Sequence, residues 1–212
     1  MLRLLTNFLL LALLAAATSN AGVVLTATLT NAQESSVTLT TSTGAARPAS
    51  FGTASFFIND AMTSMTFSAT VFNIDFGPAG MRQTADDNDN LAAAHIHAPA
   101  PPGTNTGVVW GFFGSPFNDN SPNDVVMTPF STGVGGTISG KWDLSEGNGT
   151  TFTAQLPNIL AGLSYINFHT VQNGGGEIRG QILATPEPAS LVLFGSGGLV
   201  LMAFLRCRRT RA

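Results

Sequence analysis

The sequence predicts an all-β fold, a sandwich or barrel built from short antiparallel strands. Three observations lead to this fold class. Apolar and polar residues alternate with a period of two in many short runs, of which residues 65–71 are the clearest. Glycines and prolines, 23 and 11 in number, punctuate these runs at close spacing, as turn residues do. Only residues 156–163 fit a helix, so an alternating helix–strand fold is excluded.

The strands can be placed one after another along the chain. Threonine-rich alternation predicts strands with one solvated face at residues 23–29 and 37–39. A hairpin is expected from residues 54–58 and 65–71. Further strands are expected at residues 91–98, 108–113, 138–144, 151–154, 165–170 and 178–183.

Three segments between these strands have distinct character. Residues 108–113 are apolar enough for a strand that is buried on both faces. Residues 119–136 form a long, irregular segment that we expect to be a loop. The helix of one or two turns at 156–163 has Pro157 near its start, where proline is tolerated.

The N-terminus has the features of a secretory signal peptide, which we assign to residues 1–21. A charged start with Arg3 is followed by an apolar run over residues 4–17. Small residues then supply a cleavage site between Ala21 and Gly22. A membrane anchor is the alternative, but the apolar run is short for a membrane span. We therefore expect residues 22–184 to form one exported domain.

The C-terminus, residues 185–212, contains three elements in a specific order. Pro186, Glu187 and Pro188 precede an apolar stretch at 191–205, and four arginines follow it. This order resembles the PEP-CTERM sorting signal of Gram-negative bacteria. The apolar stretch and the arginines beside it predict a C-terminal transmembrane helix that tethers the domain to the membrane. The resemblance implies cleavage near Pro-Glu-Pro by an exosortase-type sorting peptidase.

That resemblance also implies a location. The protein is expected at the cell envelope, on the outer surface or in an extracellular matrix of a Gram-negative bacterium, with exopolysaccharide as a candidate partner. A plain single-span membrane anchor is the alternative interpretation of the same residues.

Charge and cysteine content exclude some classes of function. Residues 22–185 contain four basic and eleven acidic residues, a net charge of −7, so nucleic-acid binding is disfavoured. The single cysteine, Cys207, lies in the C-terminal tail, so the exported domain has no disulfide. Asp86, Asp87 and Asp89 could offer oxygen ligands to calcium, but the glycine and glutamate of an EF-hand loop are missing.

The three histidines of the chain form the candidate site. Side chains alternate along a strand, so His95 and His97 point to the same face of theirs. His169 lies in a second alternating run, and two neighbouring strands would bring the three imidazoles together. Three neutral imidazoles with an open position suit copper or zinc. The alternative is that they are hydrogen-bonded structural residues.

Five motifs carry a resemblance to a known family. They are Leu29-Thr30-Asn31-Ala32-Gln33-Glu34, Gly52-Thr53-Ala54-Ser55-Phe56, Ala94-His95-Ile96-His97 with Gly107-Val108-Val109, Tyr165-Ile166-Asn167-Phe168-His169-Thr170, and Gly176-Glu177-Ile178-Arg179-Gly180-Gln181-Ile182. Together they resemble the CHRD domain, named from chordin, over residues 23–184. The chain departs from the family pattern in lacking a proline after Glu34 and in having Ala98 after the second histidine. The resemblance implies an antiparallel β-sandwich in an exported module, without a settled biochemical activity.

A second similarity is to copper/zinc superoxide dismutases. It implies a Greek-key sandwich of the immunoglobulin or superoxide-dismutase type, with His95, His97 and His169 as copper ligands. Arg179 lies a few positions from the expected superoxide-guiding arginine, and the zinc-site residues have no counterpart because there is no fourth histidine. A surface module with a structural or binding role is therefore the first expectation, and a copper-dependent oxidoreductase is the alternative.

Overall fold

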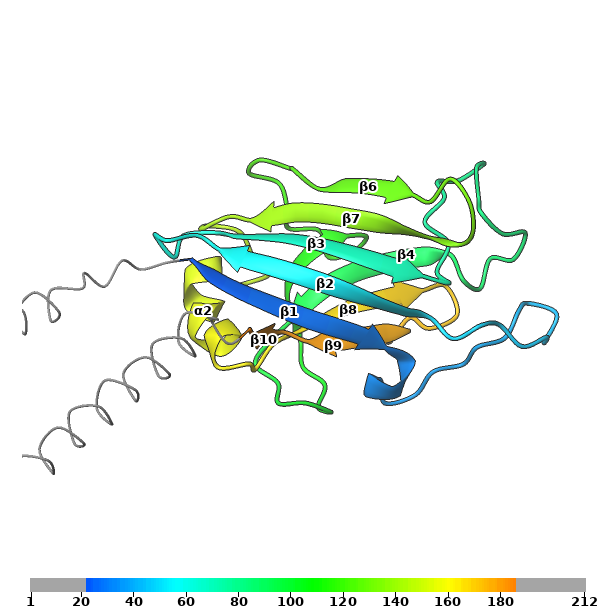
Figure 1. Ribbon diagram of the computed structural model, residues 1–212, viewed down its shortest axis with the longest axis horizontal. Helices are drawn as coiled ribbons and strands as arrows, with labels where there is room; N and C mark the ends of the chain where they lie inside the picture. The colour runs from blue at the N-terminus through cyan, green and yellow to red at the C-terminus, as the bar shows by residue number, and fades with distance from the viewer. Residues whose placement is uncertain (1–21, 186–212) are drawn as a thin grey trace, which may run out of the picture.

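A computed structural model describes residues 22–185 (Figure 1). The predicted signal peptide with Ala21, the Pro186-Glu187-Pro188 motif and the predicted transmembrane helix lie outside the described residues. Within residues 22–185, no helix is long and apolar enough to cross a membrane. The strands are β1 (Val23–Thr30), β2 (Phe51–Ile58), β3 (Met65–Phe72), β4 (Leu91–His97), β5 (Val108–Phe113), β6 (Val126–Pro129), β7 (Gly135–Trp142), β8 (Tyr165–Thr170), β9 (Ile178–Gln181) and β10 (Leu183–Ala184). A 3-10 helix, η1 (Asn31–Gln33), and a helix, α2 (Phe152–Leu160), complete the described elements.

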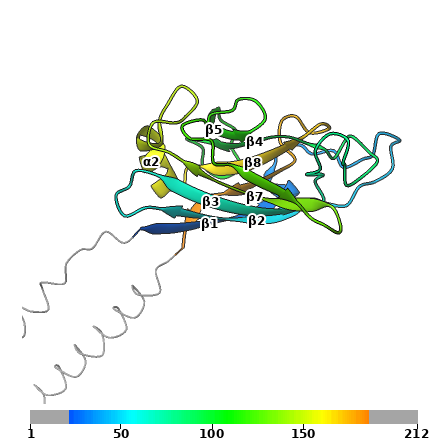
Figure 2. The same ribbon diagram turned by 90° about the horizontal axis from the view of Figure 1, so that it is seen from above.

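The ten strands form one antiparallel sheet that bends into a half-barrel with two layers. The strand order is β5-β4-β8-β9-β1-β2-β3-β7-β6, with β10 also paired to β1. The first layer contains β1, β2, β3, β7 and β6, and the second contains β5, β4, β8 and β9 (Figures 1 and 2). The two layers join where β1 pairs with β9. This pairing is antiparallel and involves one residue pair, Thr30 opposite Arg179. The predicted all-β antiparallel class is confirmed, and the finer Greek-key assignment stays a prediction.

Alternation of side chains explains the first layer. In β1 the buried residues are Leu25, Ala27 and Leu29, and threonines lie between them on the outer face. The same pattern runs through β2 and β3, which pair over eight residues each, and β3 pairs over eight residues with β7. The predicted hairpin is confirmed, because this pattern lets each strand bury one face and leave the other in water.

Aromatic side chains fill the space between the layers. Trp110 from β5 stacks on Trp142 from β7, with ring centroids 5.4 Å apart and planes 4° apart. Phe67 from β3 meets the edge of Trp110 at 5.7 Å and contacts Phe112 at 4.6 Å. Because β5 lies in one layer and β3 and β7 lie in the other, these contacts close the half-barrel across its interior.

A buried ion pair joins the loop after β1 to the hairpin between β8 and β9. The carboxylate of Glu177 is fully buried and accepts a hydrogen bond from Arg47 at 2.8 Å. It also accepts hydrogen bonds from Thr170 at 2.6 Å, from Asn173 at 2.8 Å and from Ser50. A buried charge is tolerated only when it is paired and hydrogen-bonded in this way.

Two predicted strands do not form. Residues 37–39 make no strand, because the backbone N–H groups of Thr38 and Thr40 donate to the side chains of Asn173 and Gln172 instead. Residues 151–154 begin helix α2, where the Thr151 hydroxyl caps the helix by accepting from the N–H of Ala154. A four-residue alternation cannot distinguish a strand from the first turn of a helix, and here the N-cap threonine decides the outcome.

Three strand boundaries also differ from the prediction. Strand β6 lies inside residues 119–136, which we expected to be a loop; it has four residues and pairs only with β7. Strand β7 begins earlier and ends earlier than predicted. The predicted last strand divides into β9 and β10, and the N–H of Ile182 between them donates to the carbonyl of Ser164.

The close approach of β1 and β9 makes a testable prediction. A Cβ atom at Gly180 would lie 2.6 Å from the Thr28 carbonyl oxygen, a backbone atom, so Gly180→Ala should destabilise the fold. We expect a loss of about 1–3 kcal/mol in the free energy of unfolding, measured by urea denaturation. Gly175→Ala is the control, because a Cβ there meets nothing within 4 Å, and it should change stability by less than about 0.5 kcal/mol. Equal urea midpoints for the two variants would contradict the close packing of β1 against β9 at the junction of the layers.

Candidate metal centre

The structure brings the three histidines together on two adjacent strands. His95 and His97 lie on β4, and His169 lies on β8 beside it. In the register of this pair, His95 faces Asn167 and Ala93 faces His169. The intervening residues Ala94 and Ile96 point into the core, so the histidines lie on the outer face of the second layer.

Loops cover this outer face and bury the imidazoles. His95, His97 and His169 are 4%, 7% and 7% exposed, which is low for residues on the side of a sheet away from its core. The backbone carbonyls that approach them come from Thr106, in the loop after β4, and from Gly174, in the turn between β8 and β9. The site is therefore a polar interior layer, separate from the aromatic core.

The distances between ring nitrogens agree with a common metal ion. His95 Nδ1 and His169 Nε2 are 3.1 Å apart. Two nitrogens that each lie 2.0–2.1 Å from one ion are separated by about 3.0–3.4 Å, so this pair already fits. One nitrogen from each of the three histidines lies within 4.8 Å of the others, so a pair at that limit would need to close by about 1.4–1.8 Å to share one ion. The structure thus brings the three side chains together on neighbouring strands, and metal binding by them stays a prediction.

Hydrogen bonds to carbonyl groups fix two of the rings. His97 Nδ1 lies 2.9 Å from the Thr106 carbonyl oxygen, and His169 Nδ1 lies 3.0 Å from that of Gly174. A carbonyl only accepts, so both Nδ1 atoms carry the proton; the Nε2 of His169 then accepts from the Nδ1 of His95, and the Nε2 of His97 keeps a free lone pair. Metal-binding histidines are usually oriented by this kind of hydrogen bond. Among residues 22–185, the Nε2 atoms of His97 and of His95 are both buried without a hydrogen-bond partner.

Burial keeps the imidazoles neutral. Desolvation lowers the pKa of His95 to about 4, and the neighbouring His169 and His97 act in the same direction. Desolvation likewise lowers the pKa of His97 to about 4 and lowers that of His169. The neutral form is the one that can act as a metal ligand, so no proton would have to leave a charged imidazole at neutral pH.

A buried ion pair lies next to the histidines. The ring of Tyr165 stacks on that of His97 at 4.7 Å, and the Arg179 guanidinium lies 4.7 Å above the centre of the Tyr165 ring. Arg179 donates to Glu34 at 2.6 Å and to the carbonyl of Thr104. Arg179 is 3% exposed and engaged by these groups, which differs from the substrate-guiding role that the superoxide-dismutase resemblance implied.

Sequence reasoning missed the role of Glu34 in this site, whereas the alternation of residues 165–170 already places Tyr165 on the same strand face as His169. Glu34 is 145 positions from Arg179 along the chain, and no local pattern connects the two. The only sequence signal was that both occur in motifs shared with the CHRD domain.

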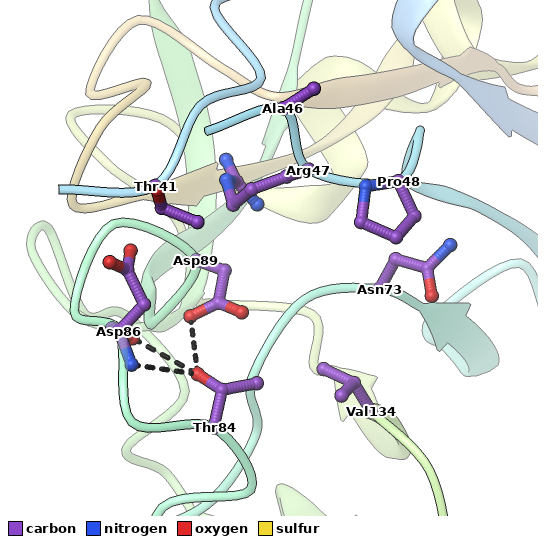
Figure 3. A pocket seen from close by; sticks show the side chains of 9 residues that line it. All are labelled: Thr41, Ala46, Arg47, Pro48, Asn73, Thr84, Asp86, Asp89 and Val134. Atoms are coloured by element: carbon purple, nitrogen blue, oxygen red, sulfur yellow. Dashed lines mark hydrogen bonds between the residues drawn. The ribbon is translucent and has the colours of Figure 1, made fainter. Parts of the chain in front are cut away.

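A cavity of about 220 Å³ lies between loops of the domain, and none of the three histidines lines it (Figure 3). Its wall includes Arg47, Asp86 and Asp89, and the Thr84 hydroxyl donates to Asp89 at 2.9 Å. Asp86 accepts from both the backbone N–H and the hydroxyl of Ser42. Within residues 22–185, the histidines are the one group of three or more metal-ligating side chains close enough to hold an ion, so the calcium interpretation gains no support.

These features define a two-layered all-β domain with a buried histidine cluster, followed by a C-terminal extension. Comparison with family models matches residues 25–182 to the CHRD domain and residues 184–209 to the PEP-CTERM protein-sorting motif. The chain therefore belongs to the CHRD-domain family and ends in a PEP-CTERM sorting motif. No curated protein and no solved structure matches it significantly.

The burial of the imidazoles makes a prediction about pH. In the metal-free protein, His95 and His97 should stay neutral as the pH falls from 8 to about 5, and should protonate near pH 4. Because the unfolded chain takes up these protons near pH 6.5, the histidines' contribution to stability is lost as the pH falls from 6.5 towards 4. Long-range ¹H–¹⁵N NMR correlations of the imidazole rings distinguish the neutral from the protonated form, and the urea-unfolded chain is the control. Midpoints near 6.5 in the folded protein would contradict the buried site.

Proposed function

We propose that the protein is an exported module of the cell surface or extracellular matrix with a structural or binding role. The observation that supports this proposal is the order of the chain, a CHRD domain followed directly by a PEP-CTERM motif. In this proposal residues 1–21 direct export and are removed between Ala21 and Gly22. An exosortase-type peptidase then recognises Pro186, Glu187 and Pro188, while the apolar segment behind them holds the chain in the membrane of a Gram-negative cell.

The positions of the two ends of the domain support display from a single attachment point. The N–H of Gly22 donates to Asp60 in the β2–β3 turn, and Thr185 donates to the carbonyl of Val24 at the start of β1. Both ends therefore lie at the same end of the domain, opposite the loops that form the cavity (Figure 1). Attachment through residue 185 leaves the loop end and the outer face of the first layer accessible.

The sorting step can be tested in cells. Replacing Pro186, Glu187 and Pro188 by alanine should retain the protein in the membrane fraction, because the peptidase would lose its recognition motif. Cell fractionation and immunoblotting of the outer-surface and secreted fractions measure this. Thr210→Ala, in the same tail, is the control and should be sorted normally. Sorting that is unaffected by the triple alanine change would disprove the proposal.

Metal binding is a second candidate function, favoured by the convergence of the histidine ring nitrogens. His95 through Nδ1 and His97 and His169 through Nε2 would hold the ion. The donor set, three neutral imidazoles, suits copper or zinc, and copper would supply one-electron redox chemistry at the site. The competing interpretation is that the histidines fasten β4 to β8, because His95 Nδ1 and His169 Nε2 lie at hydrogen-bonding distance, 3.1 Å.

A titration separates these interpretations. The purified protein should bind one equivalent of Cu(I), Cu(II) or Zn(II), and His169→Ala should weaken binding by more than about 100-fold, because it removes a ligand. Tyr165→Phe is the control, since it keeps the ring that stacks on His97 and removes no ligand. Isothermal titration calorimetry and bound-metal analysis provide the measurements. Absence of stoichiometric binding would make the histidines structural and leave the surface module as the single proposal.

A further inference from the structure

The outer face of the first layer has an unusual composition. Strands β1, β2, β3, β7 and β6 direct eighteen side chains or glycines outward, and eleven of these are serine or threonine. We call this surface the hydroxyl face; it lies towards the viewer in Figure 1. Its hydroxyl residues are Thr26, Thr28, Thr30, Thr53, Ser55, Thr66, Ser68, Thr70, Thr128, Thr137 and Ser139.

The register of the strands arranges these hydroxyls in rows. Thr28, Thr53, Thr70, Thr137 and Thr128 are direct neighbours from β1 to β6, so one row crosses all five strands. A parallel row contains Thr26, Ser55, Ser68 and Ser139. Neighbouring strands are about 4.7–4.9 Å apart, and the rows are separated by about 6.6–6.8 Å along the strands. The result is a two-dimensional array of hydrogen-bonding groups.

Most of these hydroxyls are free to bind a ligand. The Thr30 hydroxyl accepts from Gln33, and the Thr66 hydroxyl donates to a carbonyl of β2. The other nine hydroxyl groups have no hydrogen-bond partner within residues 22–185. Each hydroxyl can both donate and accept a hydrogen bond, so the face can accept from, or donate to, the hydroxyl groups of a ligand.

Exposed aromatic rings flank the array. At one end, Phe51 and Phe72 stack with ring centroids 4.8 Å apart, and they are 49% and 37% exposed. At the other end, Phe57 on the same strand as Phe51 is 44% exposed. Six residues separate Phe51 from Phe57, a span of about 20 Å. Large apolar side chains exposed on a regular sheet face often mark a binding surface.

The charge of the face restricts the type of ligand. Residues 22–185 contain eleven acidic residues, but none of them is among the eighteen outward positions of the hydroxyl face. Its single charged residue is Lys141, which is paired with Asp124 and Asp143. A cationic partner would find no counter-charge here, whereas an uncharged partner rich in hydroxyl groups would match the face.

We propose that the hydroxyl face binds a neutral polysaccharide laid along the strands. The sugar hydroxyls would exchange hydrogen bonds with the threonine and serine rows, and the apolar faces of the sugar rings would pack on Phe51, Phe72 and Phe57. This inference deepens the proposed surface function and rests on it, because a matrix polysaccharide meets the protein only after export.

The test uses full-length protein in mild detergent and two insoluble neutral polysaccharides, swollen cellulose and chitin. The wild type should be retained on at least one of them. The triple variant Thr28→Val, Thr53→Val and Thr70→Val removes three hydroxyls of the central row without changing side-chain shape. Its Kd should rise at least about tenfold, because each lost hydrogen bond is worth about two- to tenfold in affinity. Valine favours strands, so the fold should be retained, which thermal denaturation verifies.

Matched controls separate this face from the rest of the surface. Phe51→Ala should weaken retention several-fold, whereas Phe117→Ala, which removes a ring that is 41% exposed in a loop, should not. Retention on neither polysaccharide, or equal retention of the wild type and the triple variant, would overturn the inference. A third outcome is that the protein is not retained on polysaccharide but self-associates in sedimentation experiments. If Phe51→Ala abolishes that self-association, the face binds a second copy of the chain instead. Because binding is measured in vitro, a failure here is distinct from a failure of sorting in cells.

Discussion

The buried carboxylate of Glu177 is the interaction on which the arrangement of the domain depends. It lies immediately before β9 and contacts Arg47 and Ser50, which belong to the long connection between β1 and β2. It also contacts Thr170, the last residue of β8, and Asn173 in the turn that follows. One fully buried charge thus joins the second layer to the connection between two strands of the first. Removing either partner of such a pair typically costs about 3–5 kcal/mol, because the remaining charge is left unpaired.

The same group also positions the histidine site. Thr170, which donates to Glu177, directly follows His169 on β8. The turn that Glu177 closes contains Gly174, whose carbonyl accepts the Nδ1 proton of His169 and orients its ring. On the other side of Glu177, β9 places Arg179 against Glu34, and the backbone carbonyl of Glu177 accepts from Asn31. The geometry of the candidate metal site is therefore a consequence of how the β8–β9 turn is held.

The parts of the fold that sequence reasoning predicted are those governed by local patterns. Long alternation over β2 and β3 identified both strands, and the His-x-His spacing correctly placed His95 and His97 on one face. The errors arose in short segments such as residues 37–39, where side-chain amides of Asn173 and Gln172 replace a strand partner. Contacts between distant residues, such as Glu34 with Arg179, depend on the register of the sheet, which a single sequence does not determine.

The two outer faces of the half-barrel differ in solvent exposure, and this difference separates their possible functions. Loops cover the outer face of the second layer, so its polar side chains, including the three histidines, are buried and desolvated. The outer face of the first layer is bare, and its hydroxyls remain free for a large ligand. The edges of the sheet are also protected: Asn118 and Asn148 bond to the backbone of β5, and β6 is short and ends in Pro129. Because strand pairing at the edges is blocked, another molecule would have to bind to a face of the sheet. The hydroxyl face is the one that is exposed to a polymer.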